Sequence, residues 1–266
     1  MPYDHGEVPS RSNLPPVDAV SCTDRSAVAA GLIPGASIFD SFGERTSVGT
    51  TATGEDVWQG TATTIPVPPD VGEQMTLISS DAGDDNVTGQ GAKIIRVHYI
   101  DAAGDEQYED VEMDGQVEVD TIATDIRFVQ HMHSVSVGAT GVADGNITIY
   151  QKGDNTRIYS MISLGGNMSL TTNRMVPRGK KLVISGWKAT ETKAQRCTTR
   201  LRSTSHNGIL FPGIFIFIDT MTLTDSALRS ERAVLIPALA IVKLSCWNAL
   251  GTAETSAGWE GVLYDE

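Results

Sequence analysis

The chain has 266 residues, 40% of them hydrophobic and 20% charged, and a formal net charge of -13. This length can bury a large core, as one β-sandwich or as two smaller lobes. The acidity disfavours nucleic acid as a partner, because phosphate binding requires a basic surface. No apolar run reaches the roughly 18 residues of a membrane span.

Residues 1–36 are predicted to form an N-terminal arm outside the core. Four prolines lie among polar residues before position 20, and such sequence favours an extended chain. One short helix is expected from Thr23 or Asp24 through Ala30, because Gly31 can end it and Pro34 prevents its continuation. The N-terminus does not show the basic-then-apolar pattern of a signal peptide.

The remaining residues, 37–266, are predicted to form an all-β body that resembles a β-sandwich or jelly roll. Gly and Asp turns recur about every 8–12 residues between short segments of strand composition, which is typical of these folds. A subdivision near 170–175, where the chain is polar, is left open. About a dozen strands are expected, the clearest being Met75–Ser79, Ala92–Ile100, Glu106–Met113, Val117–Asp120, Ile126–Val137, Asn146–Tyr150, Thr156–Ile162, Lys181–Ser185, Arg196–Thr204, Ile214–Thr222, Leu239–Trp247 and Ser256–Leu263.

Three segments carry more specific expectations. Tyr108 is out of phase with the apolar residues of its segment, which indicates either a bulge or a strand exposed on both sides. Both faces of Ile214–Thr222 are apolar, which predicts a central strand. Thr224–Arg232 is expected to form one helical turn or a long loop.

The sequence contains no recognisable catalytic motif. A G-x-S-x-G elbow is absent, and the G-x-G of residues 89–91 is followed by Ile94 where a dinucleotide fingerprint has its third glycine. Acidic residues are numerous, yet their positions single out no glycosidase pair. Neither an enzymatic activity nor a cofactor is therefore predicted.

Two segments have residue types that suit metals. His131 and His133 are spaced so that both imidazoles point to one face of a strand, and His98 on an earlier strand is a third candidate. The simpler interpretation places these rings on a solvated or interfacial face. Residues 81–86 concentrate oxygen ligands but depart from the D-x-D-x-D-G calcium loop, so an acidic surface turn is expected there. No metal site is predicted.

The three cysteines, Cys22, Cys197 and Cys246, lie far apart in the sequence. They form neither a C-x-x-C pair nor a disulfide framework. Reduced thiols are expected, as in a chain that folds in a cytosol.

Charge is segregated along the chain. Residues 81–125 contain 13 acidic residues against Lys93 and Arg96, whereas residues 174–202 contain nine basic residues against Glu191 alone. One hypothesis is a subunit contact between the basic segment and an acidic surface of a neighbour; the other is that the two segments pair within one fold. The candidate interface residues are Arg174, Arg178, Lys180, Lys181, Arg196, Arg200 and Arg202.

Three runs of sequence carry a resemblance to a known family. They are residues 42–45 with 55–60; residues 75–81, 89–93, 99–101 and 104–106; and residues 123–127, 145–149 and 176–180. Together they resemble a family of virion structural proteins of tailed bacteriophages, frequent among phages of aquatic bacteria. The match spans about 40–185, and the motifs are strand patterns and Gly/Asp turns.

The resemblance implies a non-enzymatic virion component that is made in the host cytoplasm and assembles as a homo-oligomer. A capsid-associated decoration, cement or head-fibre-like role is expected, with the major capsid protein or other virion proteins as partners. Neither nucleic acid nor membrane is expected as a partner. The alternatives are a tail, baseplate or host receptor-binding module, and a hydrolase of cell-surface polysaccharide. The resemblance transfers no catalytic residues.

Overall fold

The computed structural model describes residues 25–193, 196–206, 208–223, 227–230 and 233–266. The predicted arm up to residue 24, including Cys22, lies outside the described residues. Within them, helix α1 spans Arg25–Ala29 and Gly31 follows it with a φ of 69°. The positive φ is the left-handed conformation that ends helices and that glycine adopts freely.

The other regular elements of the described residues are strands joined by turns and loops, which confirms the all-β prediction. The strands are β1 (Ala36–Ile38), β2 (Ser41–Val48), β3 (Glu55–Asp56), β4 (Met75–Ser79), β5 (Ala92–Asp101), β6 (Glu106–Glu112), β7 (Val119–Asp120), β8 (Ile126–Val137), β9 (Ile147–Gln151), β10 (Asp154–Ile162), β11 (Arg174–Met175), β12 (Lys180–Glu191), β13 (Cys197–Ser203), β14 (Ser205–His206), β15 (Ile209–Leu210), β16 (Ile216–Leu223), β17 (Ala227–Ser230), β18 (Val234–Ile236), β19 (Ile241–Asn248) and β20 (Ala253–Asp265).

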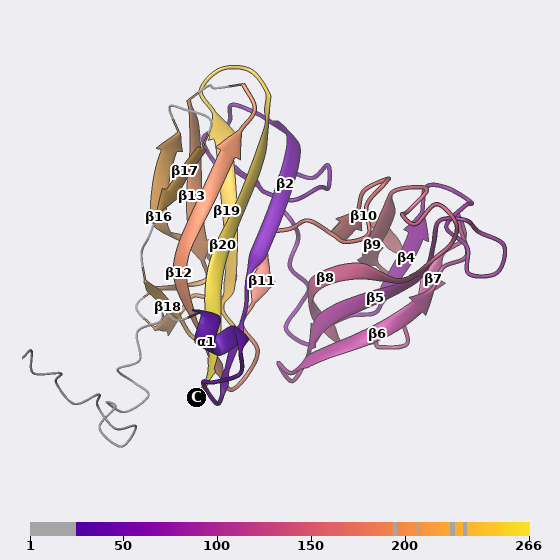
Figure 1. The fold of residues 1–266 in the computed structure, drawn as a ribbon, viewed down its shortest axis with the longest axis horizontal. Helices are drawn as coiled ribbons and strands as arrows, with labels where there is room; N and C mark the ends of the chain where they lie inside the picture. The colour runs from indigo at the N-terminus through magenta and orange to yellow at the C-terminus, as the bar shows by residue number, and fades with distance from the viewer. Residues whose placement is uncertain (1–24, 194–195, 207, 224–226, 231–232) are drawn as a thin grey trace, which may run out of the picture.

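The strands build two β-sandwiches that lie side by side (Figure 1). Sandwich 1 packs sheet A (β1, β2, β12, β17, β18, β20) on sheet B (β3, β11, β13, β16, β19). Sandwich 2 packs sheet C (β6, β5, β8) on sheet D (β10, β9, β4, β7). The small hairpin β14–β15 extends from sandwich 1. The strand pairs of the four sheets are antiparallel.

Sandwich 2 is an insertion in sandwich 1. Strands β1 to β3 pair with the C-terminal strands, as in the register Phe42↔Gly258, while β4 to β10 pair among themselves. The body expected over 37–266 is thus built as two units. The chain crosses between them once in the segment before β4 and again near 163–173, close to the subdivision left open at 170–175.

Each sandwich has its own apolar core. Trp187 and Trp259 of sheet A pack with Leu201 and Leu244 of sheet B, and the Trp259 indole donates a hydrogen bond to the Thr172 carbonyl at 2.9 Å. A core of this size stabilises a domain mainly by removing apolar surface from water. Two buried ion pairs hold β3 against its neighbours. Arg45 of β2 binds Glu55 at 2.6 Å, and Lys243 of β19 binds Asp56 at 2.8 Å.

Two expectations about strands are wrong. β16 is not central: it pairs with β13 and forms an edge of sheet B among the described residues, with Ile214 and Phe217 about 60% exposed. Phe217 contacts the Arg200 guanidinium on one side and remains exposed, so its apolar side chain does not mark a central strand. The segment Thr224–Arg232 contains strand β17, which pairs with β12; its sequence lacks the alternation by which a strand is detected.

Tyr108 lies on the exposed outer face of β6, an edge strand of sheet C whose other face carries the buried core residue Val111. Its register with β5 runs without interruption from Ile94 to Ile100. Neither a bulge nor exposure on both faces accounts for its position, because Tyr108 lies on the outer face and Val111 on the buried inner face. Among the described residues, no helix is long and apolar enough to cross a bilayer.

Candidate functional site

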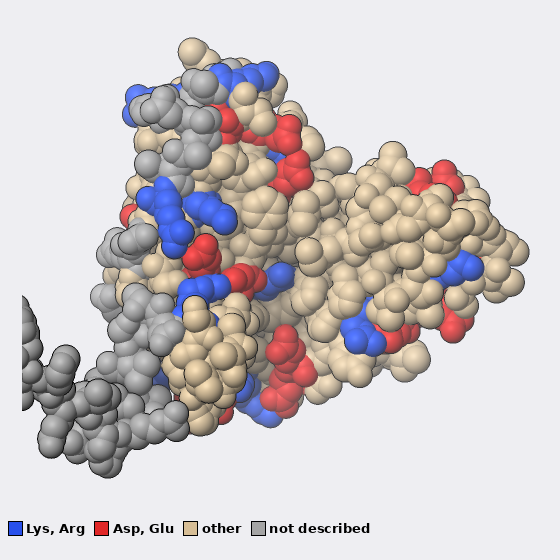
Figure 2. Space-filling model, in the orientation of Figure 1, with Lys and Arg blue, Asp and Glu red and all other residues tan. Residues whose placement is uncertain are grey.

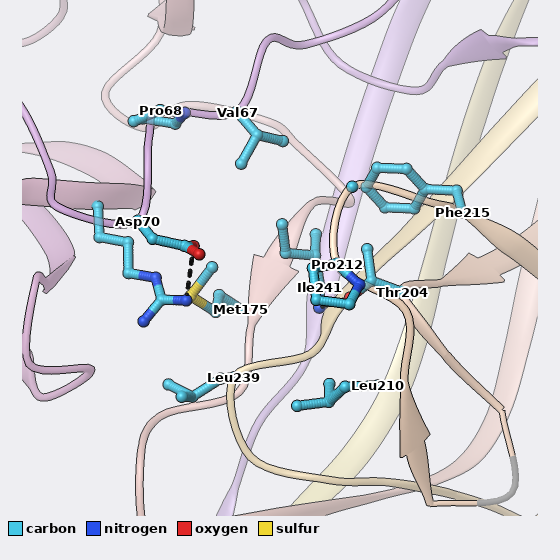
Figure 3. A pocket seen from close by; sticks show the side chains of 12 residues that line it. Val67, Pro68, Asp70, Met175, Thr204, Leu210, Pro212, Phe215, Leu239 and Ile241 are labelled. Carbon is cyan, nitrogen blue, oxygen red and sulfur yellow. Dashed lines mark hydrogen bonds and ion pairs between the residues drawn. The ribbon is translucent and has the colours of Figure 1, made fainter.

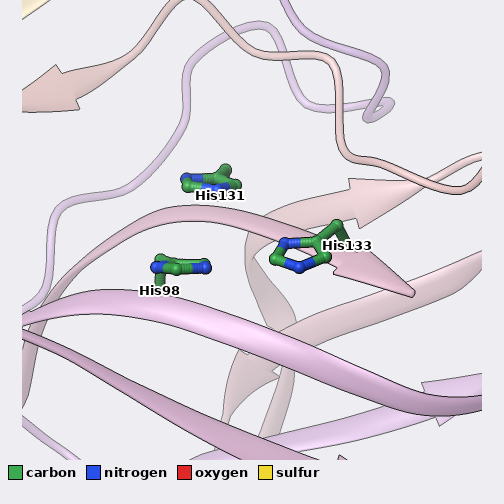
Figure 4. Close-up of side chains that lie close together, drawn as sticks. All are labelled: His98, His131 and His133. Carbon is green, nitrogen blue, oxygen red and sulfur yellow. The ribbon is translucent and has the colours of Figure 1, made fainter. Parts of the chain in front are cut away.

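Three histidines meet on the outer face of sheet C, close to sandwich 1 (Figure 4). His98 comes from β5, and His131 and His133 come from β8. His98 is the register partner of His131. The side chains that alternate with them, such as Val97 and Met132, point into the core of sandwich 2.

A β-bulge gives the histidines their common face. The register runs from His98↔His131 to Tyr99↔Val129, so Gln130 is an extra residue in β8. Without it, Phe128 and His131 would face opposite sides, because side chains alternate along a strand. With it, Phe128 packs toward sandwich 1 and His131 points to the same outer face.

The imidazole rings are stacked. The ring centroids of His98 and His131 are 4.3 Å apart with planes 8° apart, and those of His98 and His133 are 5.2 Å apart. One nitrogen from each ring lies within 4.8 Å of the other two. All three rings are partly buried.

Burial lowers the pKa of all three imidazoles and favours their neutral form. Desolvation lowers the pKa of His131 to about 2, with further contributions from Arg174 and the other two histidines. Desolvation is also the main cause of the lowered pKa of His98 and of His133. Neutral imidazoles retain a nitrogen lone pair that can accept a hydrogen bond or bind a metal.

Charged side chains surround the cluster in balanced numbers. Arg96 forms a two-contact ion pair with Asp110, at 2.7 and 2.8 Å, and lies 4.3 Å from the centroid of the Tyr108 ring. Arg174 donates a hydrogen bond to the Gln130 carbonyl. Its pKa is lowered to about 10 by burial, which the charge of Glu106 partly opposes.

Gln130 also joins the two sandwiches. Its side-chain amide donates to the Met175 carbonyl at 2.6 Å, and its side-chain oxygen accepts from the Met175 N–H at 3.0 Å. The side chain thereby pairs with β11 as a strand backbone would. Ile100 and Phe128 pack on Met175 and Ile241 beside it, which makes this junction both polar and apolar.

A cavity of about 230 Å³ lies between the two sandwiches (Figure 3). Phe215, Leu239 and Ile241 form its apolar wall, and the ion pair of Asp70 with Arg127, at 2.7 Å, lies at its other side. It is lined mainly by side chains without catalytic chemistry.

The structure separates the seven predicted interface residues. Arg174 lies at the junction, Arg178 bridges the sandwiches through an ion pair with Asp105 at 2.6 Å, and Lys180 pairs with Asp265. Lys181 lies beside Lys180 on β12, and exposed Arg196 precedes β13.

Arg200 and Arg202 are brought together on one face of β13. The Arg200 guanidinium lies 4.8 Å from the ring of Phe217 and 4.5 Å from that of Trp247. Arg202 donates to the Thr53 carbonyl at 2.5 Å. We name Arg200, Arg202, Phe217 and Trp247 the arginine-aromatic face.

The acidic segment contributes some internal pairs. Asp105 binds Arg178 and Asp110 binds Arg96, so part of the charge segregation is balanced within the fold. In the view of Figure 2, acidic and basic side chains also lie close together over sandwich 1. Exposed acids nevertheless remain along the edge strand β6, including Glu106 and Glu112.

The acidic turn at residues 81–86 is held by hydrogen bonds within the protein. The fully buried Asp84 carboxylate accepts from Ser79, Ala92, Asp144 and Gly145, at 2.6 to 2.9 Å. The buried Asp84 carboxylate also explains why residue 91 is glycine, because a Cβ at this position would lie 2.3 Å from an Asp84 oxygen.

Cys197 and Cys246 are free and buried on neighbouring strands. The pKa of Cys197 is lowered to about 7, mainly by a hydrogen bond with Cys246.

Sequence reasoning missed the role of Gln130 and the aromatic partners of Arg200. The sequence does contain a sign of the bulge at Gln130. Val129 and Met132 are both apolar core residues but lie three positions apart, which interrupts the two-residue period of the strand. The partnership of Arg200 with Trp247 depends on pairing between β13 and β19, which lie far apart in sequence.

No protein-family model matches the chain, and no curated protein matches it. Among solved structures, the chain is similar to a structure of infectious bursal disease virus Gt strain, with 10% identity over 90% of this chain and 77% of that chain and a TM-score of 0.24. It is also similar to the VP2 subviral particle of the same virus, with 11% identity over 91% and 77% of the two chains and a TM-score of 0.18. TM-scores this low do not establish a shared fold.

Proposed function

We propose that this chain is a non-enzymatic structural component of a tailed-phage virion, present in many copies as a capsid-associated decoration, cement or head-fibre-like protein. The sequence runs described above support a virion role. The main structural support for assembly in many copies is the arginine-aromatic face, which lies beside the exposed edge strand β16.

The composition of this face is typical of protein interfaces. Tryptophan, other aromatics and arginine are enriched at the centres of interfaces, where they contribute most of the binding energy. The rings of Phe217 and Trp247 flank Arg200, which reduces the rotamer freedom that the side chain loses on binding. Phe217 is 59% exposed and is therefore available to a partner.

The proposed partner surface is strand β6 of the next copy. Glu106, Asp110 and Glu112 are exposed on this edge, and opposite charges guide two surfaces into register. Because the two surfaces lie on different sandwiches, the contact can repeat from head to tail, and the proposed assembly is a ring or an extended array.

Charge reversal tests this contact. The double variant Arg200→Glu with Arg202→Glu is compared with Lys152→Glu with Lys193→Glu, which changes the net charge equally at other sites. We expect light scattering to show low-salt oligomers for the wild type and the control, and monomers for the arginine variant. Adding Glu106→Arg and Glu112→Arg to the arginine variant should restore assembly.

If the arginine variant assembles as the wild type does, and salt does not change its assembly, the proposed contact is contradicted. Binding to purified major capsid protein and to host surface material then distinguishes the capsid role from the alternative host-binding role. Capture by host surface material alone would favour the alternative.

A further inference from the structure

We propose that His98, His131 and His133 bind one divalent transition-metal ion on the outer face of sheet C. The inference rests on their convergence from two paired strands, and it is independent of the virion role. Imidazole nitrogen is a ligand for zinc, nickel, copper and iron, whereas calcium and magnesium prefer oxygen.

The backbone already supplies most of the geometry. His131 and His133 point to one face, and the bulge at Gln130 places His98 opposite His131. One nitrogen from each ring lies within 4.8 Å of the others. Zinc–nitrogen bonds of about 2.0–2.1 Å in a tetrahedral site need nitrogens about 3.3–3.5 Å apart, so the side chains have only a short distance to close.

The rings must turn to bind. Their planes differ by 8° to 25°, and the lone pair of each nitrogen lies in its ring plane. A shared ion therefore needs rotation about the last side-chain torsion, which has a broad energy profile in histidine. The partial exposure of all three rings leaves room for this rotation.

Among the neighbouring charges, Arg96 and Arg174 disfavour a cation at the cluster and Asp110 favours it. Arg96 is paired with Asp110, and Arg174, which faces the cluster from β11, is bonded to the Gln130 carbonyl and influenced by Glu106. These four groups carry two positive and two negative charges. Tyr108, on β6, adds a neutral aromatic ring at 6.0 Å from His98.

An ion bound by all three rings would cross-link β5 to β8 next to the contact of Gln130 with Met175. Three protein ligands leave a fourth tetrahedral position for water or an added ligand. A ligand that binds only the folded state raises the apparent stability in proportion to the logarithm of its concentration over its dissociation constant. Zinc binding should therefore raise the melting temperature of the folded chain.

The test uses tag-free full-length protein, treated with chelator and then titrated with zinc chloride in a calorimeter. We expect one zinc per chain and a rise in melting temperature, with no comparable rise for calcium or magnesium. His98→Gln and His133→Gln should each weaken binding at least about tenfold. His206→Gln changes an exposed histidine on β14 and serves as the control, with binding unchanged.

Cobalt provides a second readout, because its visible spectrum reports nitrogen coordination directly. The cobalt spectrum should change in His133→Gln and not in His206→Gln. If His98→Gln lowers the metal-free melting temperature, His133→Gln decides the question. Absence of zinc binding, or binding that His98→Gln and His133→Gln leave unchanged, would overturn the proposal and leave the cluster as a stack of neutral rings.

Discussion

At the scale of single residues, Gln130 connects three features of the molecule. Its extra place in β8 turns His131 to the outer face, its side chain pairs with Met175, and its carbonyl accepts from Arg174. One bulged residue therefore sets both the histidine cluster and the junction of the sandwiches. Bulges commonly redirect side chains in this way.

Replacing Gln130 with alanine should lower the free energy of unfolding by about 1–3 kcal/mol. The variant leaves the buried N–H and carbonyl of Met175 without their partners, and an unsatisfied buried polar group costs about that much. Denaturant titration measures the change. Gln107→Ala, on exposed β6, is the matched control and should shift stability little; equal losses in both variants would contradict the role of Gln130.

The histidines should make the metal-free protein less stable in acid. Their pKa values are lowered in the folded state, and that of His131 is about 2, against about 6.5 when unfolded. The unfolded chain therefore binds more protons between pH 6.5 and the folded pKa, and stability falls as pH drops through this window. The loss is at most about 1.4 kcal/mol per pH unit for each excluded proton, and less for the better solvated rings.

Melting temperatures measured with chelator from pH 7.5 to 4.5 check this sign. His131→Gln should flatten the dependence, because it removes the imidazole whose protonation is most strongly opposed. A wild-type curve with the same slope as the variant would show that other groups cause the acid sensitivity.

At the scale of elements, strands with a clear two-residue period could be predicted from sequence. The predicted Ala92–Ile100 agrees with β5 to within one residue, because a half-buried strand leaves its alternation in the sequence. β16 and β17 were predicted wrongly for physical reasons. Phe217 of β16 is exposed and contacts Arg200, so its apolar character does not mark a central strand. β17 is specified by its pairing with β12, which no local pattern records.

Asp84 is the buried anchor of the loop between β4 and β5, and Asp84→Asn should cost about 3 kcal/mol. Its two oxygens accept four hydrogen bonds, and an asparagine NH₂ would face N–H donors in place of an acceptor. Thermal unfolding and amide exchange of Ala92 and Gly145 measure the loss. Asp81→Asn, which changes an exposed aspartate, is the control. An equal loss of stability in this variant would show that the removed negative charge, and not the lost hydrogen bonds of Asp84, causes the effect.

At the scale of the whole molecule, the two sandwiches are formed by different parts of the chain. A continuous stretch forms sandwich 2, the two flanking parts form sandwich 1, and the two units share one junction. Sandwich 2 is built from neighbouring segments, so its strands and turns could be predicted. Sandwich 1 pairs strands more than 200 residues apart, such as β2 with β20. Its existence as a separate unit could therefore not be predicted from local sequence patterns. The same limit applies to the candidate site: the His131 and His133 spacing is visible in sequence, but the approach of His98 depends on register.

The arrangement also separates the two proposed contact surfaces. The arginine-aromatic face belongs to sandwich 1 and the acidic β6 edge to sandwich 2, so one copy can bind a neighbour on each side. The proposed virion role therefore predicts many copies of the protein on each particle.

The most direct test of the proposed virion role is to search for the protein in purified virus particles from its source. Quantitative mass spectrometry with cryo-electron microscopy should find many copies bound to the particle exterior, and particles carrying Arg200→Glu with Arg202→Glu should lose them. Recovery of the wild-type protein only in the soluble fraction of the lysate, with none on particles, would contradict the virion role.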